Sequence, residues 1–305
     1  MPEPAPLLLL DLPWLLYRSF FALPSSITDE EGRPVNALLG AVNAVLSLIE
    51  ARLAARGPRR VVACTGAEQA DYRVALYAGY HAHRDPMPDA LAAQFERAPQ
   101  LLDALGWTVS ASEALEADDV MFSLARVEEA HGGRALLLTA DRDLFGAVSE
   151  RVAVLRPRKG AAAEQIGPAQ VRDLYGVEPQ LVPDLIALRG DPSDGLPGAP
   201  GIGAKTAAAL LRQHGSLEAV LEAAREQAAR PAARGRDAIA PRAALALREN
   251  AELLLTFKQI ATLQRIRMRR PADRASDFAA GARQARRMGM RGLAGRLQEL
   301  ARART

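Results

Sequence analysis

Short apolar runs alternate with longer amphipathic stretches over the first half of the chain. Runs of four or five mostly apolar residues bounded by polar ones are typical of strands buried on both faces. The stretches at 36–55 and 118–130 carry apolar residues at helical spacing. Strands that alternate with helices predict a mostly parallel sheet with helices on both faces. The predicted strands are Leu7–Leu10, Arg60–Ala63, Trp107–Ser110, Ala135–Thr139 and Val152–Leu155.

From Ile166 onward the pattern becomes helical, so we predict an α/β domain over residues 1–165 and a helical domain over 166–305. Turn-forming residues separate the predicted helices of the second domain. A single amphipathic helix is predicted over Leu245–Leu263. The other predicted helical segments are Val171–Tyr175, Leu181–Leu188 and Thr206–Gln213, the last of which stops at His214-Gly215.

Acidic residues follow three of the predicted strands. They are Asp11 after the first, Glu116, Asp118 and Asp119 after the third, and Asp141 and Asp143 after the fourth. The carboxyl ends of parallel strands meet at one edge of a sheet, which is where ligands bind. Crowded carboxylates repel one another unless a cation neutralises them, and hard divalent cations prefer such oxygens. The sequence therefore predicts a divalent metal site.

Each acid also has a structural interpretation. Asp118 and Asp119 suit the first turn of a helix, and Asp141 and Asp143 suit a turn. Asp11 could instead serve a haloacid-dehalogenase-like phosphatase, but that chemistry needs a second aspartate where Pro13 stands.

One strand departs from this pattern. Arg60–Ala63 leads into Cys64 and Thr65, with no acid before Glu68. Thr65 occupies the position where another carboxylate would be expected.

The segment 190–206, GDPSDGLPGAPGIGAKT, places carboxylates beside a glycine-rich helix start. Asp191 and Asp194 suit a metal ion. Backbone N–H groups at the start of a helix suit phosphate, and such a contact recognises backbone rather than base sequence. The two together favour a phosphodiester substrate. A Walker-type loop needs glycine directly before the lysine and a preceding strand, whereas Ala204 precedes Lys205 and residues 185–188 look helical.

Composition narrows the possibilities further. The chain has 305 residues, of which 49% are hydrophobic, enough for one large or two modest domains. Apolar runs are too short to span a membrane, and Leu7–Leu10 is too short for a signal-peptide core, so we expect a cytoplasmic protein. Cys64 is the only cysteine, which excludes an internal disulfide. The net charge of +3 permits nucleic-acid binding without proving it. Arginines between Arg265 and Arg304 fit a solvated helical face at least as well as a DNA contact.

Four motifs in this order resemble one family. LLLLDLPWLLYRSFFALP at 7–24, EADD at 116–119, TADRD at 139–143 and GDPSDGLPGAPGIGAKTA at 190–207 are similar to the bacterial 5′→3′ exonucleases and flap endonucleases, including the N-terminal nuclease domain of DNA polymerase I. The resemblance covers most of the chain and is strongest up to about Leu221. It implies a PIN-like α/β fold with a C-terminal helix-three-turn-helix DNA-binding module at about 185–225.

The resemblance also implies a site. It makes Asp11, Glu116, Asp118, Asp119, Asp141, Asp143, Asp191 and Asp194 ligands of two Mg²⁺ or Mn²⁺ ions, and it implies K⁺ at the hairpin backbone. It implies a helical arch at about 75–102 and a substrate of DNA with a 5′ end or 5′ flap. The residues expected at the DNA are Arg73, Tyr80, His81, Arg84, Gly201, Gly203, Lys205 and Thr206.

Two positions depart from the family pattern, which normally has aspartate at Thr65 and lysine at His81. A hydroxyl should weaken one metal position, and a histidine is charged only below a pKa near 6.5 in the reference state. Two rivals to an active nuclease follow: a structure-specific DNA-binding paralogue with weakened or lost catalysis, and an RNA-directed nuclease of the wider PIN-like group. We expect a monomer and, since the sequence ends at Thr305 without a polymerase domain, a polymerase partner would be a separate chain.

Overall fold

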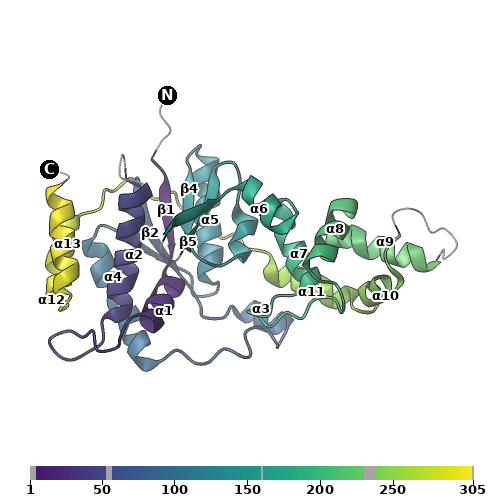
Figure 1. Ribbon diagram of the computed structural model, residues 1–305, viewed down its shortest axis with the longest axis horizontal. Coiled ribbons are helices and arrows are strands. Elements are labelled where there is room, and N and C mark those ends of the chain that lie inside the picture. Colours follow the sequence, from purple (N-terminus) through teal and green to yellow (C-terminus); the bar gives the residue numbers. More distant parts are fainter. Residues whose placement is uncertain (1–4, 53–56, 159–160, 230–237, 304–305) are drawn as a thin grey trace.

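The computed structural model describes residues 5–52, 57–158, 161–229 and 238–303. Its centre is a six-stranded sheet with the order β3-β2-β1-β4-β5-β6 (Figure 1). The first five strands are parallel, and β6 runs antiparallel to β5. The predicted mostly parallel sheet is confirmed. The strands are β1 (Leu7–Asp11), β2 (Arg60–Thr65), β3 (Thr108–Ala111), β4 (Ala135–Leu138), β5 (Val152–Arg158) and β6 (Ala161–Ile166).

Helices connect and cover these strands, and a helical half follows them. The first half contains α1 (Leu12–Ala22), α2 (Asn36–Arg52), α3 (Asp71–Leu76), α4 (Asp89–Ala104), α5 (Ala117–Ala130) and the 3-10 helix η1 (Asp143–Ala147). The second half contains α6 (Pro168–Tyr175), η2 (Pro179–Leu181), α7 (Val182–Arg189), α8 (Ala204–His214), α9 (Leu217–Ala229), α10 (Pro241–Glu249), α11 (Ala251–Ala261), α12 (Phe278–Arg287) and α13 (Arg291–Arg302).

Strand β1 lies in the middle of the sheet and is buried on both faces. Leu7 and Leu9 point into one hydrophobic core, and Leu8 and Leu10 point into the other. Side chains alternate across a strand, so only a continuous apolar run can supply both cores. This explains why the four leucines precede Asp11, which is then held at the carboxyl end of the most buried strand.

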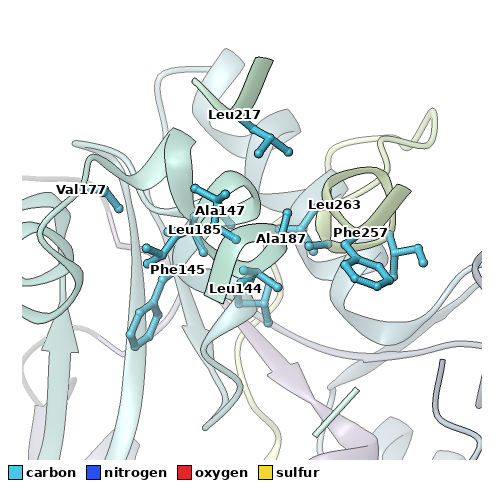
Figure 2. Close-up of a cluster of buried hydrophobic side chains, with 14 of the residues drawn as sticks. Leu144, Phe145, Ala147, Val177, Leu185, Ala187, Leu217, Phe257 and Leu263 are labelled. Atoms are coloured by element: carbon cyan, nitrogen blue, oxygen red, sulfur yellow. The ribbon is translucent and has the colours of Figure 1, made fainter. Parts of the chain in front are cut away.

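One of the two cores continues from the sheet into the helical half. Leu144 and Phe145 of η1 lie in the same cluster as Leu185 of α7 and Phe257 of α11 (Figure 2). These side chains are at most 1% exposed. Continuous burial of apolar surface therefore joins the end of β4 to the helices that carry the second half of the site.

The last two helices return to the α/β half of the molecule. Phe278 of α12 and Leu297 of α13 belong to the other core, together with Leu8 and Leu10 of β1. Figure 1 shows the α12–α13 pair beside α2 and α4, at the end of the molecule away from α8 and α9. The predicted division at 165/166 stays a prediction, but these two helices pack against α4 and α2, which cover the sheet, rather than against the other helices of the second half.

Some predicted elements differ from the observed ones. The predicted helix at 36–55 is observed to Arg52, and residues 53–55 lie outside the described residues. The single helix predicted over 245–263 is wrong, because the chain turns at Asn250 between α10 and α11. Both the backbone N–H and the side-chain amide of Asn250 donate to the carbonyl of Ala246, at 3.1 and 2.8 Å, which caps the end of α10. Strand β6 carries too few apolar residues to have been predicted.

No helix in the described parts of the chain is both long and apolar enough to cross a membrane.

The packing of α13 gives a first prediction. Leu297→Ala should lower the free energy of unfolding by about 2–5 kcal/mol, because Leu297 is fully buried in the core beneath β1. Leu245→Ala is the matched control, since Leu245 is 45% exposed on α10 and should cost only about 0.5 kcal/mol. Urea denaturation measures both. Equal losses would show that α13 does not contribute to this core.

Candidate functional site

The Asp11 carboxylate lies at the carboxyl end of β1 and caps α1. It accepts a hydrogen bond from the backbone N–H of Trp14 at 3.0 Å and one from the hydroxyl of Thr139 at 2.7 Å. The residue is 9% exposed, and desolvation raises the pKa of its carboxyl group despite these two donors. Asp11 therefore ties β1 to the end of β4.

Thr139 begins a chain of contacts that orders the acids after β4. Its hydroxyl oxygen accepts from the N–H of Asp141 at 2.9 Å, and an Asp141 carboxylate oxygen accepts from the N–H of Asp143 at 2.9 Å. These short-range bonds hold Asp141 and Asp143 beside Asp11. Sequence reasoning missed this role of Thr139, although the TADRD motif contains it.

Asp191 and Asp194 lie on a tight loop after α7. Backbone bonds between Asp191 and Leu196 close the loop, at 2.8 Å in each direction. Gly198 makes the closure possible: it has φ +69°, and a Cβ there would lie 2.3 Å from the nitrogen of Gly190. Asp191 also accepts from the N–H and the hydroxyl of Ser193. The loop thus presents both aspartates toward the sheet edge.

The four aspartates of these two segments repel one another. Desolvation raises the pKa of Asp141 to about 7, and the negative charges of Asp194, Asp11 and Asp191 add to the rise. Because Asp141 is exposed at the surface, repulsion between the carboxylates is the firmer of these causes. Desolvation and the negative charges of Asp141, Asp194 and Asp191 raise the pKa of Asp143 well above its usual value. The structure therefore gathers Asp141, Asp143, Asp191 and Asp194 as the sequence predicts.

Asp194 differs from Asp141 and Asp143 because it has basic partners, as does Asp191, which lies 3.6 Å from Arg189. His81 Nε2 lies 3.0 Å and Arg84 Nη2 lies 3.2 Å from the same Asp194 oxygen. Although desolvation opposes it, the hydrogen bond and charge of His81 and the charge of Arg84 lower the pKa of Asp194. His81 also donates its backbone N–H to the Asp194 carbonyl at 3.1 Å.

The segment between α3 and α4 therefore rests on the Asp191–Leu196 loop. His81 is 2% exposed, its φ is +53°, and its ring stacks on Tyr80 at 3.8 Å. A left-handed φ is uncommon for a residue other than glycine and indicates that surrounding contacts hold the backbone there. Of the predicted arch at 75–102, α3 and α4 account for the two ends, and residues 77–88 form turns and extended chain between them.

The second group of acids surrounds Arg73. Its guanidinium lies 2.9 Å from Glu116, 3.0 Å from Asp119 and 3.6 Å from Asp118, and its side chain is 2% exposed. The Tyr80 hydroxyl donates to Glu116 at 2.9 Å, and Tyr80 is 4% exposed. Arg73 and Tyr80 were predicted to contact DNA; in this structure both side chains are buried against carboxylates.

Desolvation raises the pKa of Asp118 well above its usual value and also raises that of Asp119, although the charge of Arg73 opposes both shifts. Asp118 additionally feels the negative charge of Asp141, which lies in the first group. The two acidic groups are therefore electrostatically one site, with Asp118 between them.

Thr65 ends β2, next to the strand that ends in Asp11. Register pairs Cys64 with Asp11 and Thr65 with Ala111 of β3, so the threonine stands at the same sheet edge as the acids. Gly66 lets the chain turn closely past the next acidic segment, since a Cβ there would lie 2.1 Å from the carbonyl of Leu115. A neutral hydroxyl thus stands at a sheet edge where carboxylates follow the neighbouring strands.

Helices α7 and α8 form the predicted hairpin. The connecting chain has positive φ at four glycines, the last of them Gly201 at +79°. Gly203 is the N-cap of α8 and has no side-chain cap, so backbone N–H groups of the first turn have no intrahelical partner. Gly201, Gly203, Lys205 and Thr206 are all exposed. The loop follows a helix rather than a strand, which excludes a Walker-type arrangement.

The donor set suits a hard divalent ion. The charges of Asp191 and Asp194 lie close enough to raise the pKa values of Asp141 and Asp143, and carboxylate oxygens are the ligands that Mg²⁺ and Mn²⁺ prefer. Within the described ranges, no three Asp, Glu, His or Cys side chains are already arranged around one point as ion ligands. Several of these carboxylates instead contact protein groups: Asp191 accepts from Ser193, Asp194 lies on His81, and Glu116 lies on Arg73.

Fold and site together define a nuclease-like α/β protein, and comparison with known proteins identifies the family. A model described as the 5′-3′ exonuclease N-terminal resolvase-like domain matches residues 6–176, and one described as the 5′-3′ exonuclease C-terminal SAM fold matches residues 177–274. The chain belongs to the 5′-3′ exonuclease family. The predicted α/β fold with a C-terminal helical module is thereby confirmed.

Relatives are consistent with this family. A 5′-3′ exonuclease of Mycobacterium tuberculosis is 39% identical over 72% of this chain and 74% of its own length. DNA polymerase I of Mycobacterium leprae is also 39% identical over 71% of this chain, but the match spans only 24% of the polymerase.

Solved structures show the same fold at low identity. A bacteriophage T5 5′-exonuclease with bound zinc has a TM-score of 0.62 at 17% identity and covers 97% of this chain and 99% of its own. The catalytic core of Rad2 in complex with DNA substrate has a TM-score of 0.64 at 12% identity, covering 96% and 91%.

The raised pKa of Asp141 gives a second prediction. Its value of about 7 in the folded protein exceeds the ordinary value near 3.9, so the folded state binds the extra proton between these pH values. Stability therefore falls as pH rises through this window. In EDTA at pH 8, Asp141→Asn should stabilise the protein by on the order of 1 kcal/mol, because solvent screens an exposed group. The gain should vanish near pH 4.

Thermal unfolding at the two pH values measures this effect. Asp173→Asn, an exposed carboxylate on α6, is the control and should change stability little at either pH. A loss of stability for Asp141→Asn at pH 8 in EDTA would show that the carboxylates do not repel one another as the geometry indicates.

Proposed function

We propose that this protein is a divalent-metal-dependent 5′→3′ exonuclease or 5′-flap endonuclease that hydrolyses phosphodiester bonds of DNA in replication or repair. The observation that carries this proposal is a loop directly before a glycine-rich helical hairpin, whose Asp191 and Asp194 lie close to Asp141 and Asp143. Metal ligands and a phosphate-binding backbone are thus joined on one loop. Membership of the 5′-3′ exonuclease family supports the same activity.

The proposed ion is Mg²⁺ or Mn²⁺, held by Asp141, Asp143, Asp191 and Asp194, with Asp11 and Asp118 beside them. An ion bound there polarises a phosphate oxygen and lowers the pKa of an attacking water. The cluster supports this, since the raised pKa values of Asp141 and Asp143 are those of carboxylates that lack a counter-charge.

Residues between α3 and α4 would orient the scissile phosphate. The side chain of Arg84 is 43% exposed and lies on Asp194, so its guanidinium can reach a phosphate placed at the aspartates. His81 is buried on the same carboxylate and would act by holding Arg84 and the Asp194 loop in place. This arrangement supports a site in which Arg84 offsets phosphate charge as hydrolysis proceeds.

The hairpin would bind the duplex part of the DNA. The exposed backbone at Gly201 and Gly203 and the exposed side chains of Lys205 and Thr206 suit phosphate contacts that are independent of base sequence. We include K⁺ at the hairpin backbone in the proposal. Binding of the duplex by the hairpin would set how far the 5′ strand reaches toward the aspartates.

Relatives suggest the wider setting of this activity. Because several are DNA polymerase I chains, we propose that the protein works beside a separate DNA polymerase, as a monomer in the cytoplasm.

Cleavage of a 5′-labelled flap DNA tests the proposal. Wild-type protein with Mg²⁺ or Mn²⁺ should release the flap, and Asp141→Ala should cut at least ~100-fold more slowly, since even outer-shell partners of a metal contribute roughly 10–100-fold. Asp173→Ala on α6 is the matched control and should cut at the wild-type rate. Tight flap binding without turnover would instead indicate a DNA-binding paralogue, and preference for a matched RNA flap would indicate an RNA-directed nuclease.

The hairpin gives a separate prediction about binding. Lys205→Ala should weaken DNA binding equally for different sequences and reduce the slope of log affinity against log salt by about 1, as expected for one lost phosphate contact. Arg225→Ala, which removes an exposed charge on α9, is the control and should leave the slope unchanged. Fluorescence anisotropy over a salt series measures both. An unchanged slope for Lys205→Ala would place the phosphate contact elsewhere.

A further inference from the structure

Arg73 is a buried cation at the centre of the second acidic group. Its guanidinium lies within 3.0 Å of both Glu116 and Asp119, and its side chain is 2% exposed. The nitrogen Nε donates to the carbonyl of Ile260 on α11 at 3.1 Å. The guanidinium is therefore fixed from two sides, by the acids of α5 and by the backbone of the helical half.

Protein donors already occupy both oxygens of Glu116. Oε1 accepts from the N–H of Ala70 at 2.8 Å, and Oε2 accepts from the hydroxyl of Tyr80 at 2.9 Å and lies 2.9 Å from Arg73. An ion that used Glu116 as a ligand would have to displace at least one of these buried contacts. Displacement would leave a buried donor without a partner, which is costly.

Only one oxygen of Asp119 is occupied in the same way. Its Oδ1 accepts from Arg73 at 3.0 Å and from the N–H of Gln264 at 2.6 Å. Its Oδ2 is buried without a hydrogen-bond donor, and the whole residue is 0% exposed. The charge of Arg73 is therefore what offsets this carboxylate, and hydrated ions have no exposed oxygen of Asp119 to approach.

Thr65 removes the remaining carboxylate that could compete with Arg73. It stands at the end of β2, beside β1 and β3, and carries only a hydroxyl. Without a carboxylate there, the second group has three acids, two of which Arg73 holds closely.

Asp118 differs from its two neighbours. It lies 3.6 Å from Arg73, beyond hydrogen-bond distance, and it interacts electrostatically with Asp141 and Asp143. Asp118 therefore lies between Arg73 and the aspartates 141, 143, 191 and 194 and interacts with both.

We propose that Arg73 takes the place of a second metal ion, so that the protein binds a single divalent ion, at the aspartates 141, 143, 191 and 194 with Asp118 at their side. Arg73 is then a positioning residue: it neutralises Glu116 and Asp119 and connects them to α11. This inference rests on the proposed function for the identity of the ion, and it replaces the two ions expected from the sequence with one ion and one guanidinium.

Counting bound ions tests the proposal without relying on cleavage. Titration of the full chain with Mn²⁺, followed by the loss of the free-ion electron paramagnetic resonance signal, should give one ion per chain. Asp141→Asn should weaken that ion at least tenfold, and Glu116→Gln should change its affinity less than twofold. Two ions of similar affinity in the wild type, or an ion lost with Glu116→Gln and kept with Asp141→Asn, would overturn the proposal.

Variants at the second group complete the test. Arg73→Gln should admit a second Mn²⁺, whereas Arg59→Gln, which alters a buried arginine paired with Glu128 away from the site, should not. Since Arg73→Gln can also fail to fold, Thr65→Asp provides an independent variant: a new carboxylate should raise the affinity for a second ion at least tenfold. If neither variant gains an ion, the proposal is wrong.

The count also separates this inference from the proposed function. One ion without any flap cleavage supports the inference and rejects the nuclease activity. Two ions with cleavage reject the inference alone, and no bound ion rejects both.

Discussion

The structure depends on how carboxylates crowded at one edge of a parallel sheet are neutralised. Strands β1 and β4 and the segment after β3 each deliver acids to this edge, and the α7–α8 loop adds two more. Such a concentration of negative charge opposes folding unless cations, donors or protons offset it. The surrounding chain supplies such partners to some of the acids. The acids that it leaves without a basic partner are the ones available to bind an ion.

The two acidic groups are neutralised in different ways. Around Glu116 and Asp119 the protein uses its own cation, Arg73, together with the hydroxyl of Tyr80 and backbone N–H groups. Around Asp141 and Asp143 no buried guanidinium is present among the described contacts, and the pKa values of both carboxyl groups rise. A divalent ion relieves the second situation far better than the first. The two groups therefore differ in how their negative charge is neutralised. Thr65 contributes to this difference, because it carries a hydroxyl and not a carboxylate.

Both halves of the molecule are needed to build the site. The helical half supplies the Asp191–Asp194 loop, and its Ile260 carbonyl and Gln264 N–H fix Arg73 and Asp119 from behind. A continuous hydrophobic core connects these helices to η1 and the sheet, so the loop is held at a defined distance from the strand ends (Figure 2). The same loop leads into the hairpin. The proposed duplex contact at α8 is consequently connected by a short stretch of chain to the acids that are proposed to act on the 5′ strand.

The sequence by itself determined the sheet, the acids at its edge and the hairpin, because apolar runs, strand-end acids and glycine-rich turns are local signals. Only the tertiary structure decided which acids have a basic partner and which do not. Arg73, Tyr80 and Ile260 meet the acidic group across long sequence separations, and no local pattern encodes that meeting. The packing of α12 and α13 against α2 and α4 and the break at Asn250 were likewise decided by the tertiary structure. Helical periodicity shows which face of a helix is apolar but not which element covers that face.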